Sequence, residues 1–256
     1  MIRYIARFAT VVVGLLLLWQ MIVSLSGTPP YILPPPPAVL SALIDNVPLL
    51  ARHAGITIVE IAAGLTLGTL LGSLSAMTMS RFGGVRRWLL PVLVISQALP
   101  VFALAPLLVL WLGYGLASKI AMATLIIYFP VTATFYDGLR RAEAGWLDLA
   151  RTMNASPTAT LRHIRFPAAL PALASGLKVS AAVAPIGAVV GEWVGSSAGL
   201  GYLMLHSNAQ LKTPLMFAAL MVLCAIGLSL YFTIDVLSRR LTPWQRDDLS
   251  NQRGNE

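Results

Sequence analysis

Long apolar blocks separated by short polar stretches restrict most strongly what this chain can fold into. A helix needs about 20 consecutive, mostly apolar residues to cross the roughly 30 Å hydrocarbon core of a bilayer. Six blocks meet this requirement and define the predicted spans: residues 8–25, 54–79, 88–112, 117–136, 170–194 and 215–237. Only 11% of the residues are charged, against about 25% in a typical soluble domain. We therefore predict an all-α polytopic membrane protein with six transmembrane helices.

The basic residues orient these spans. With the N-terminus inside, fourteen of the eighteen Lys and Arg residues fall on the inner side, Lys178 lies within a span, and three fall outside: Arg52, Lys119 and Lys212. Such an excess is typical of cytoplasmic loops, so both termini are predicted to be cytoplasmic. This topology accounts for the net charge of +8, and no nucleic-acid partner is expected.

The first apolar block has an alternative interpretation as a cleavable signal peptide, because Arg3 and Arg7 precede it. Its removal would leave the orientation of the other spans unchanged. The block lacks an Ala-x-Ala cleavage site, and Trp19-Gln20 fits poorly in the apolar region of a signal peptide. A retained first span is therefore favoured.

Glycine and proline positions give finer expectations for two spans. The second span carries glycines every four residues on one face, a spacing that permits close helix packing: Gly64, Gly68 and Gly72. The third span contains three prolines, which predict kinks: Pro91, Pro100 and Pro106.

Two segments are predicted on the outer side. Residues 28–37 are rich in proline and predict a stiff polyproline II spacer, followed by a short interfacial helix over residues 38–46. Residues 195–214 are rich in Gly and Ser, and we expect a loop that rests on an outside partner or lines a pore entrance. The lone His206 there is weak evidence for a metal. The single cysteine, Cys224, excludes an internal disulfide and a cysteine-based metal cluster, so no metal site is predicted.

The connection between spans four and five, residues 137–167, is the most informative polar segment. Residues 146–153 predict a short helix with one apolar stripe: Trp146, Leu149, Ala150 and Met153. Asn154 follows where helices commonly end in a left-handed residue. Ser156 and Pro157 are typical of the start of a second helix, and Pro167 marks the beginning of span five.

The apolar stripe has a charged rim: Arg141, Asp148 and Arg151. An exposed apolar stripe of this kind favours docking onto another protein. A helix that lies on the bilayer surface is the alternative.

The same loop resembles the EAA loop of permease subunits in bacterial ABC-type importers. The family pattern is Glu-Ala-Ala, three residues, Gly, nine residues and then Ile-x-Leu-Pro. The spacing matches throughout, with Asp148 in place of the Glu, Asn154 in place of the Gly, and Ile164 and Pro167 near the end. This chain departs from the pattern at four positions: Asp148, Leu149, Asn154 and Phe166.

The resemblance implies that the loop is a coupling helix, which enters a groove on an ATPase subunit. The residues expected to carry this coupling are Trp146, Asp148, Leu149, Ala150, Arg151, Met153, Asn154, Ile164 and Pro167. Leu149 is bulkier than the alanine of the family pattern, so the helix presents a larger apolar surface to the partner at this position.

Stretches outside the loop resemble the nitrate, sulfonate and taurine branch of this family: residues 32–36, 97–107 and 191–201. Residues 111–115 and 202–205 look most similar to permeases for hydroxymethylpyrimidine, a thiamine precursor. The resemblance implies one permease domain over residues 1–256, in the bacterial inner membrane. It also implies a second copy of the chain, an ATPase subunit and an extracytoplasmic substrate-binding protein as partners. No cofactor is expected, since the ATPase subunit would bind the ATP.

Other function classes are disfavoured by missing motifs. The chain has no Gly-x-x-x-x-Gly-Lys-Ser/Thr phosphate loop and no His-Glu-x-x-His, so an enzyme is not expected. An ion-coupled secondary transporter would typically show internal repeats and broken helices near the bilayer midplane. No clear repeat is present, and such a transporter would leave the docking loop unexplained.

Charged residues inside spans are functional candidates, because each is costly in the bilayer. We identify three, Glu60, Lys178 and Glu192, and assign them with Trp193 to the translocation pathway. A hydrogen bond between helices is the alternative for each, and Lys178 has the further option of extending to the inner surface. Lys178 and Glu192 are about 21 Å apart along one helix, so they cannot pair with each other.

Overall fold

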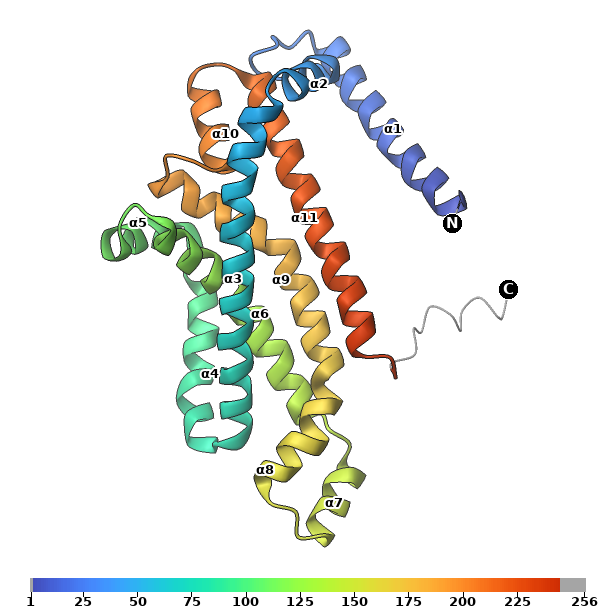
Figure 1. Ribbon diagram of the computed structural model, residues 1–256, viewed down its shortest axis with the longest axis vertical. Coiled ribbons are helices and arrows are strands. Elements are labelled where there is room, and N and C mark those ends of the chain that lie inside the picture. Colours follow the sequence, from blue (N-terminus) through green and yellow to red (C-terminus); the bar gives the residue numbers. More distant parts are fainter. Residues whose placement is uncertain (1, 245–256) are drawn as a thin grey trace.

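A computed structural model describes residues 2–244, and the side chains from residue 10 onward. Within this range the backbone is helical and contains no strand (Figure 1). The helices, in chain order, are α1 (Ile2–Ser26), α2 (Pro36–Asp45), α3 (Val47–Arg81), α4 (Gly83–Ala98), α5 (Val101–Leu112), α6 (Leu116–Arg140), α7 (Ala144–Thr152), α8 (Pro157–Thr160), a π turn (Leu161–Arg165), α9 (Phe166–Gly195), α10 (Leu200–Ala209) and α11 (Thr213–Leu241).

Four of these helices are long and apolar enough to cross a membrane: α3, α6, α11, and α9 together with α8 and the π turn that precede it. The α4–α5 pair would add a fifth span if it crosses as one unit, and α1 contributes a shorter apolar stretch, Thr10–Ser26. The all-α membrane fold is therefore confirmed. The predicted count of six spans is consistent with this arrangement, although one of the six is broken.

The break lies in the predicted span of residues 88–112. Helices α4 and α5 meet at Leu99 and Pro100 with a bend of 106°. Pro91 and Pro106 lie inside their helices and do not interrupt them. Pro100 takes the N-cap position of α5, where a missing N–H costs nothing. The three prolines were expected to kink one helix, whereas one of them separates two.

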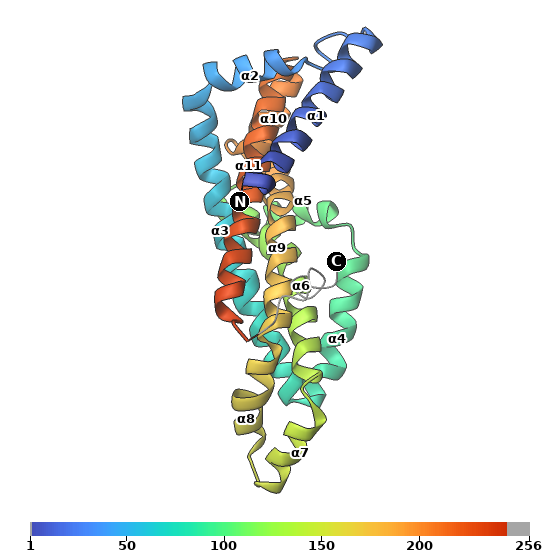
Figure 2. The same ribbon diagram turned by 90° about the vertical axis from the view of Figure 1, so that its right-hand side faces the viewer.

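Helices α3, α6 and α9 form the centre of the molecule (Figures 1 and 2). The glycine face of α3 lies directly against α6, as the four-residue spacing predicted. A Cβ added to Gly68 would lie 2.6 Å from Cγ2 of Ile127. Because that distance is well inside van der Waals contact, only glycine allows the two helices to approach so closely.

Helices α2 and α10 lie at one end of the molecule, opposite the end formed by α7 and α8 (Figure 1). Helix α2 agrees within two residues with the short helix predicted after the proline-rich run. The segment 195–214 was wrongly predicted as a loop, since it contains the ten-residue helix α10. Leu200 and Leu203 are buried against neighbouring helices, and this tertiary burial outweighs the local Gly and Ser content.

The second helix of the 137–167 connection is not separate from span five. Helix α8 continues through the π turn directly into α9, giving one helical unit over Pro157–Gly195. Pro167 lies in the first turn of α9, where a proline is tolerated. Helix α9 begins at Phe166, beside the predicted boundary at Pro167, but the helical backbone is not interrupted there, so the connection is joined directly to a membrane-spanning helix.

Candidate functional sites in the α7–α8 arm and the helix core

Residues 141–165, which we call the α7–α8 arm, fold back on themselves through a defined turn. The amide of Ala155 donates to the carbonyl of Ala150 at 2.9 Å, and the amide of Asn154 donates to the carbonyl of Arg151 at 3.0 Å. These two bonds form a Schellman motif, which requires a left-handed residue. Asn154 has φ 50°, as predicted from its position after the helix.

The start of α8 is capped as the sequence predicted. The side chain of Ser156 accepts a hydrogen bond from the amide of Ala159 at 3.2 Å, and Pro157 occupies the first turn. Together with the Schellman turn, this cap fixes the angle between the two short helices. These hydrogen bonds define the local geometry of the arm.

The predicted apolar stripe of α7 is divided between two environments. Trp146, Leu149 and Met153 are more than half exposed, whereas only 5% of Ala150 is exposed. Ala150 packs inside the arm, because α8 folds back over that side of α7. The exposed side chains line a groove of about 320 Å³, whose other wall includes His163. Ala150, which was expected on the docking face, also lines this groove, although it is far less exposed than its neighbours.

The polar members of the arm have smaller roles in its stability. Asp148 and Arg151 form an ion pair of 2.8 Å, but both side chains are largely exposed. Such pairs contribute about 0–1 kcal/mol, so this pair does not determine the fold of the arm. Ile164 and Pro167 are half-buried where the arm joins α9.

A second group of candidates lies in the helix core around Glu192 of α9. Its side chain is 1% exposed. It accepts hydrogen bonds from the hydroxyl of Thr57 at 2.6 Å and from the amides of Gly201 and Tyr202. This matches the alternative in which Glu192 bonds to neighbouring helices, and not the expectation that it reaches water.

The backbone around Glu192 is shaped to leave room for its carboxylate. Gly199 has φ +113°, and a Cβ at that position would overlap the carboxyl group of Glu192. The amide of Gly199 donates to Nδ1 of His53 at 3.0 Å, and the amide of Leu200 donates to the hydroxyl of Thr57 at 2.9 Å. Four backbone amides that begin α10 are thus bound by side chains of α3 and α9.

Glu60 and Lys119 form a buried ion pair between α3 and α6, with 3.2 Å between Nζ and Oε1. Glu60 is fully buried and Lys119 is 5% exposed. Thr57, whose hydroxyl donates to Glu192, lies three residues before Glu60 on α3, so the two carboxylates lie in the same part of the core. The prediction had placed Lys119 on the outer side and had therefore left Glu60 without a partner.

Lys178 is paired as well, with Asp235 of α11 at 2.5 Å from Nζ to Oδ1. Asp235 also accepts a hydrogen bond from Arg239, with 3.0 Å between Nε and Oδ2. The idea that Lys178 simply extends to the surface is not supported by this pairing. Both missed partners, Lys119 and Asp235, lie within the predicted spans, and a search for opposite charges in those spans would have found them.

Trp193 points away from its neighbour Glu192. It is half-exposed and lines an apolar groove of about 840 Å³ between α9 and α11. The structure thus brings Glu60 and Glu192 together and leaves Lys178 and Trp193 apart from them. None of these contacts tests whether the four residues line the translocation pathway, which stays a prediction.

Comparison with known protein families identifies the family of this chain. Residues 68–243, from the middle of α3 to the end of α11, match the family described as binding-protein-dependent transport system inner membrane component. The chain belongs to this family. The match includes the whole α7–α8 arm and the central helices α6 and α9.

Individual relatives agree with this membership over almost the full length. A probable ABC transporter permease protein of Haemophilus influenzae is 58% identical, over 88% of this chain and 92% of its own. The formylaminopyrimidine transport permease protein ThiX of Halalkalibacterium halodurans is 36% identical, over 91% and 93%. The riboflavin transport system permease protein RibX of Chloroflexus aurantiacus is 35% identical, over 95% and 94%.

A solved structure agrees with the fold. A chain of the MetNI methionine ABC transporter, in an inward facing conformation, superposes with a TM-score of 0.67 at 20% identity. The superposition covers 77% of this chain and 98% of the other. The protein is therefore a multi-pass permease subunit of an ABC importer, a non-catalytic membrane component whose ATP is hydrolysed by a separate subunit.

Proposed function

We propose that this permease carries a pyrimidine precursor of thiamine across the bacterial inner membrane. Two copies of the chain form the pathway, two ATPase subunits dock on the α7–α8 arms in the cytoplasm, and an extracytoplasmic binding protein delivers the substrate. Both termini lie in the cytoplasm, as the excess of Lys and Arg predicts. The permease contributes no covalent chemistry. It couples ATP-driven movement of its partners to the opening of the pathway.

The observation that carries this proposal is the exposed apolar face at the tip of the α7–α8 arm. Trp146, Leu149 and Met153 are each more than half exposed. They belong to α7 and the turn after it, and α7 lies at the far end of the molecule from α2 and α10 (Figure 1). Exposed apolar residues grouped in this way mark protein contacts. Because α8 is continuous with α9 through the π turn, a force applied to the arm reaches the membrane-spanning helix directly.

A charge placed on the exposed face tests the docking role. In Leu149→Asp, a carboxylate would have to enter an apolar groove of the ATPase, which costs several kcal/mol if the charge finds no partner. We expect co-purification of the ATPase subunit to fall at least tenfold while membrane insertion is unchanged. The matched control is Thr158→Asp, since Thr158 is exposed on α8 but lines neither side of the groove. Equal ATPase recovery with both variants would contradict the docking role.

The substrate rests on a narrower observation. ThiX, whose name specifies formylaminopyrimidine, is 36% identical over nearly the whole chain, which supports a pyrimidine. RibX is named for riboflavin at almost the same identity, so a larger heteroaromatic substrate is a second candidate. Sulfonate, taurine and nitrate are the further alternatives, from the branch that residues 191–201 resemble.

Binding measurements on the partner substrate-binding protein distinguish these candidates. Hydroxymethylpyrimidine and formylaminopyrimidine are titrated beside riboflavin, taurine and nitrate, and uptake of the bound compound is then measured with the reconstituted importer. Tight binding of a pyrimidine, together with ATP-dependent uptake that requires this permease, is the expected result. Binding of taurine or nitrate alone would refute the pyrimidine assignment and leave the importer role intact.

A further inference from the structure

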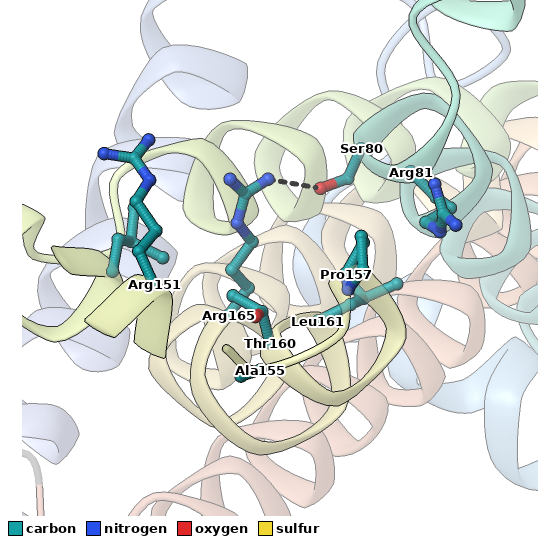
Figure 3. Close-up of a pocket in the computed structure, with 9 residues that line it drawn as sticks. Ser80, Arg81, Arg151, Ala155, Pro157, Thr160, Leu161 and Arg165 are labelled. Carbon is teal, nitrogen blue, oxygen red and sulfur yellow. Dashed lines mark hydrogen bonds between the residues drawn. The ribbon is translucent and has the colours of Figure 1, made fainter. Parts of the chain in front are cut away.

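Three arginines from three different elements surround one pocket where the α7–α8 arm meets the end of α3. The pocket, of about 270 Å³, is lined by Arg81 of α3, Arg151 of α7 and Arg165 of the π turn, with Ser80 and Thr160 beside them. In Figure 3, Arg165 lies between the other two and points toward Ser80. None of the described side chains that line the pocket is acidic.

The central arginine is partly buried and has few hydrogen-bond acceptors around it. Arg165 donates one long hydrogen bond, 3.4 Å from Nη1 to Oγ of Ser80. Its Nε is buried and has no acceptor within the described part of the chain. A guanidinium offers five donors in a planar fork that fits carboxylate and phosphate oxygens. Since Arg151 alone is neutralised, by Asp148, the pocket keeps a positive charge and an unused set of donors.

We propose that this pocket binds a phosphate group, supplied by the headgroup of an anionic phospholipid. Water occupies about 30 Å³ per molecule in the liquid, so the pocket has room for a tetrahedral anion and several waters. Nε and the free Nη donors of Arg165 would bind two phosphate oxygens, with Arg81 and Arg151 on either side. Such charge-assisted bonds are about twice as strong as neutral ones.

The position of the pocket relative to the membrane favours a lipid over a soluble ligand. Ser80 and Arg81 are the last two residues of α3, an apolar helix that crosses the membrane, so the pocket lies where headgroups lie. The guanidinium of Arg81 is 5.1 Å from the centre of the exposed Phe82 ring, and Trp88 is 82% exposed on the next helix. Aromatic side chains of this kind are typical of the membrane interface.

The pocket is also separate from the face that we assign to the ATPase. The groove beside Leu149 and the arginine pocket share only Ala155 and Thr160, which lie between them. A carboxylate of the ATPase is therefore a less favoured occupant. The lipid proposal does not depend on the identity of the transported substrate, and its test needs no transport.

The test uses the purified full-length permease in a non-ionic detergent. Dioctanoyl phosphatidylglycerol is titrated while the melting temperature is followed, and dioctanoylglycerol, which has the same chains without a phosphate, is titrated in parallel. We expect a saturable rise in melting temperature with the first compound only. In Arg165→Gln the half-saturating concentration should rise about tenfold or more. In Arg162→Gln, an exposed arginine of the same π turn outside the pocket, it should stay within twofold.

Two further measurements identify the source of the phosphate and provide a replacement variant in case Arg165→Gln misfolds. If inorganic phosphate saturates the wild type over the same concentration range and fails with Arg165→Gln, the phosphate site stands and its ligand is soluble. Arg81→Gln, at an exposed position, replaces Arg165→Gln if that variant does not fold, and should weaken binding severalfold.

Three results would overturn the lipid proposal. One is equal titration of Arg165→Gln and Arg162→Gln. Another is an equal rise with phosphatidylglycerol and dioctanoylglycerol, which would indicate binding of the chains alone. The third is unchanged lipid titration of Arg165→Gln together with loss of ATPase association, which would assign the pocket to an acidic residue of the ATPase.

Discussion

The hydroxyl of Thr57 on α3 donates a hydrogen bond of 2.6 Å to the carboxylate of Glu192 on α9, across 135 residues of sequence. The same carboxylate accepts hydrogen bonds from the backbone amides of Gly201 and Tyr202, in the first turn of α10. A carboxylate near a helix N-terminus is favoured by the helix dipole. One side chain therefore holds three helices together at the end of the molecule opposite the α7–α8 arm.

Glu192→Gln tests whether this network is structural. Glutamine keeps the shape but replaces one acceptor oxygen with an NH₂ group, so at least one of the buried donors loses its acceptor. We expect the unfolding free energy to fall by about 1–3 kcal/mol, the usual cost of an unsatisfied buried group, measured by thermal unfolding in detergent. Glu143→Gln is the control, since Glu143 is exposed and its side chain does not cap α7.

Uptake measured on the same variant separates the two roles of Glu192. If the role is structural, uptake falls only in proportion to the amount of folded protein. A pathway role that needs the charge predicts the opposite result, which is reduced uptake by a protein of unchanged stability.

Gly68→Ala tests the close approach of α3 and α6. The added Cβ would lie 2.6 Å from Cγ2 and 2.8 Å from Cβ of Ile127, which is the branched part of a side chain with little freedom to move. We expect a loss of about 1–3 kcal/mol from overpacking, seen as a lower melting temperature. Gly55→Ala on the same helix is the matched control, because nothing lies within 4 Å of its added Cβ. Equal melting of the two variants would refute the proposed contact.

Much of the fold was predictable because it follows from local chemistry. The apolar blocks, the glycine face of α3, the left-handed Asn154 and the Ser156 cap each depend on a few neighbouring residues. The bend at Pro100 and the burial of α10 depend on contacts with other helices, and the local pattern contains no such information. The ion-pair partners of Glu60 and Lys178 lie on different helices, so only the tertiary fold shows the pairing, although both partners could have been noticed as charges within predicted spans.

For the candidate site, too, the sequence predicted the local elements but not the contacts between them. Spacing identified the α7–α8 arm and its apolar stripe, but it could not show which residues of the stripe face outward. The return of α8 over one side of α7 buries Ala150 and leaves Leu149 exposed. The arginine pocket escaped prediction entirely, because Arg81, Arg151 and Arg165 come from three elements that only the tertiary fold brings together.

Variants of Asn154 test the turn that sets the shape of the arm. With φ at 50°, Asn154→Gly should be tolerated, whereas Asn154→Val should cost about 1–2 kcal/mol of local strain. We expect ATPase co-purification and uptake to be normal for the glycine variant and reduced severalfold for the valine variant. Thr158→Val controls for the introduction of valine at an exposed position of the arm. Identical uptake by Asn154→Gly and Asn154→Val would argue against a functional role for the turn.

The last prediction concerns the buried pair of Glu60 and Lys119. Removal of one partner leaves the other charge buried without compensation, which typically costs about 3–5 kcal/mol, whereas replacement of both is often nearly neutral. Lys119→Met and Glu60→Leu should therefore each lower the melting temperature strongly, and the double variant should recover much of the loss.

The two residues lie on the central helices α3 and α6. Neither carboxylate oxygen of Glu60 has a well-aligned hydrogen bond in the described structure, so the charge of Lys119 is the main compensation for the charge of Glu60. A double variant as unstable as the sum of the two single variants would show that the residues do not act as a pair. If the stable double variant is also inactive in uptake, the pair has a role in transport beyond its contribution to stability.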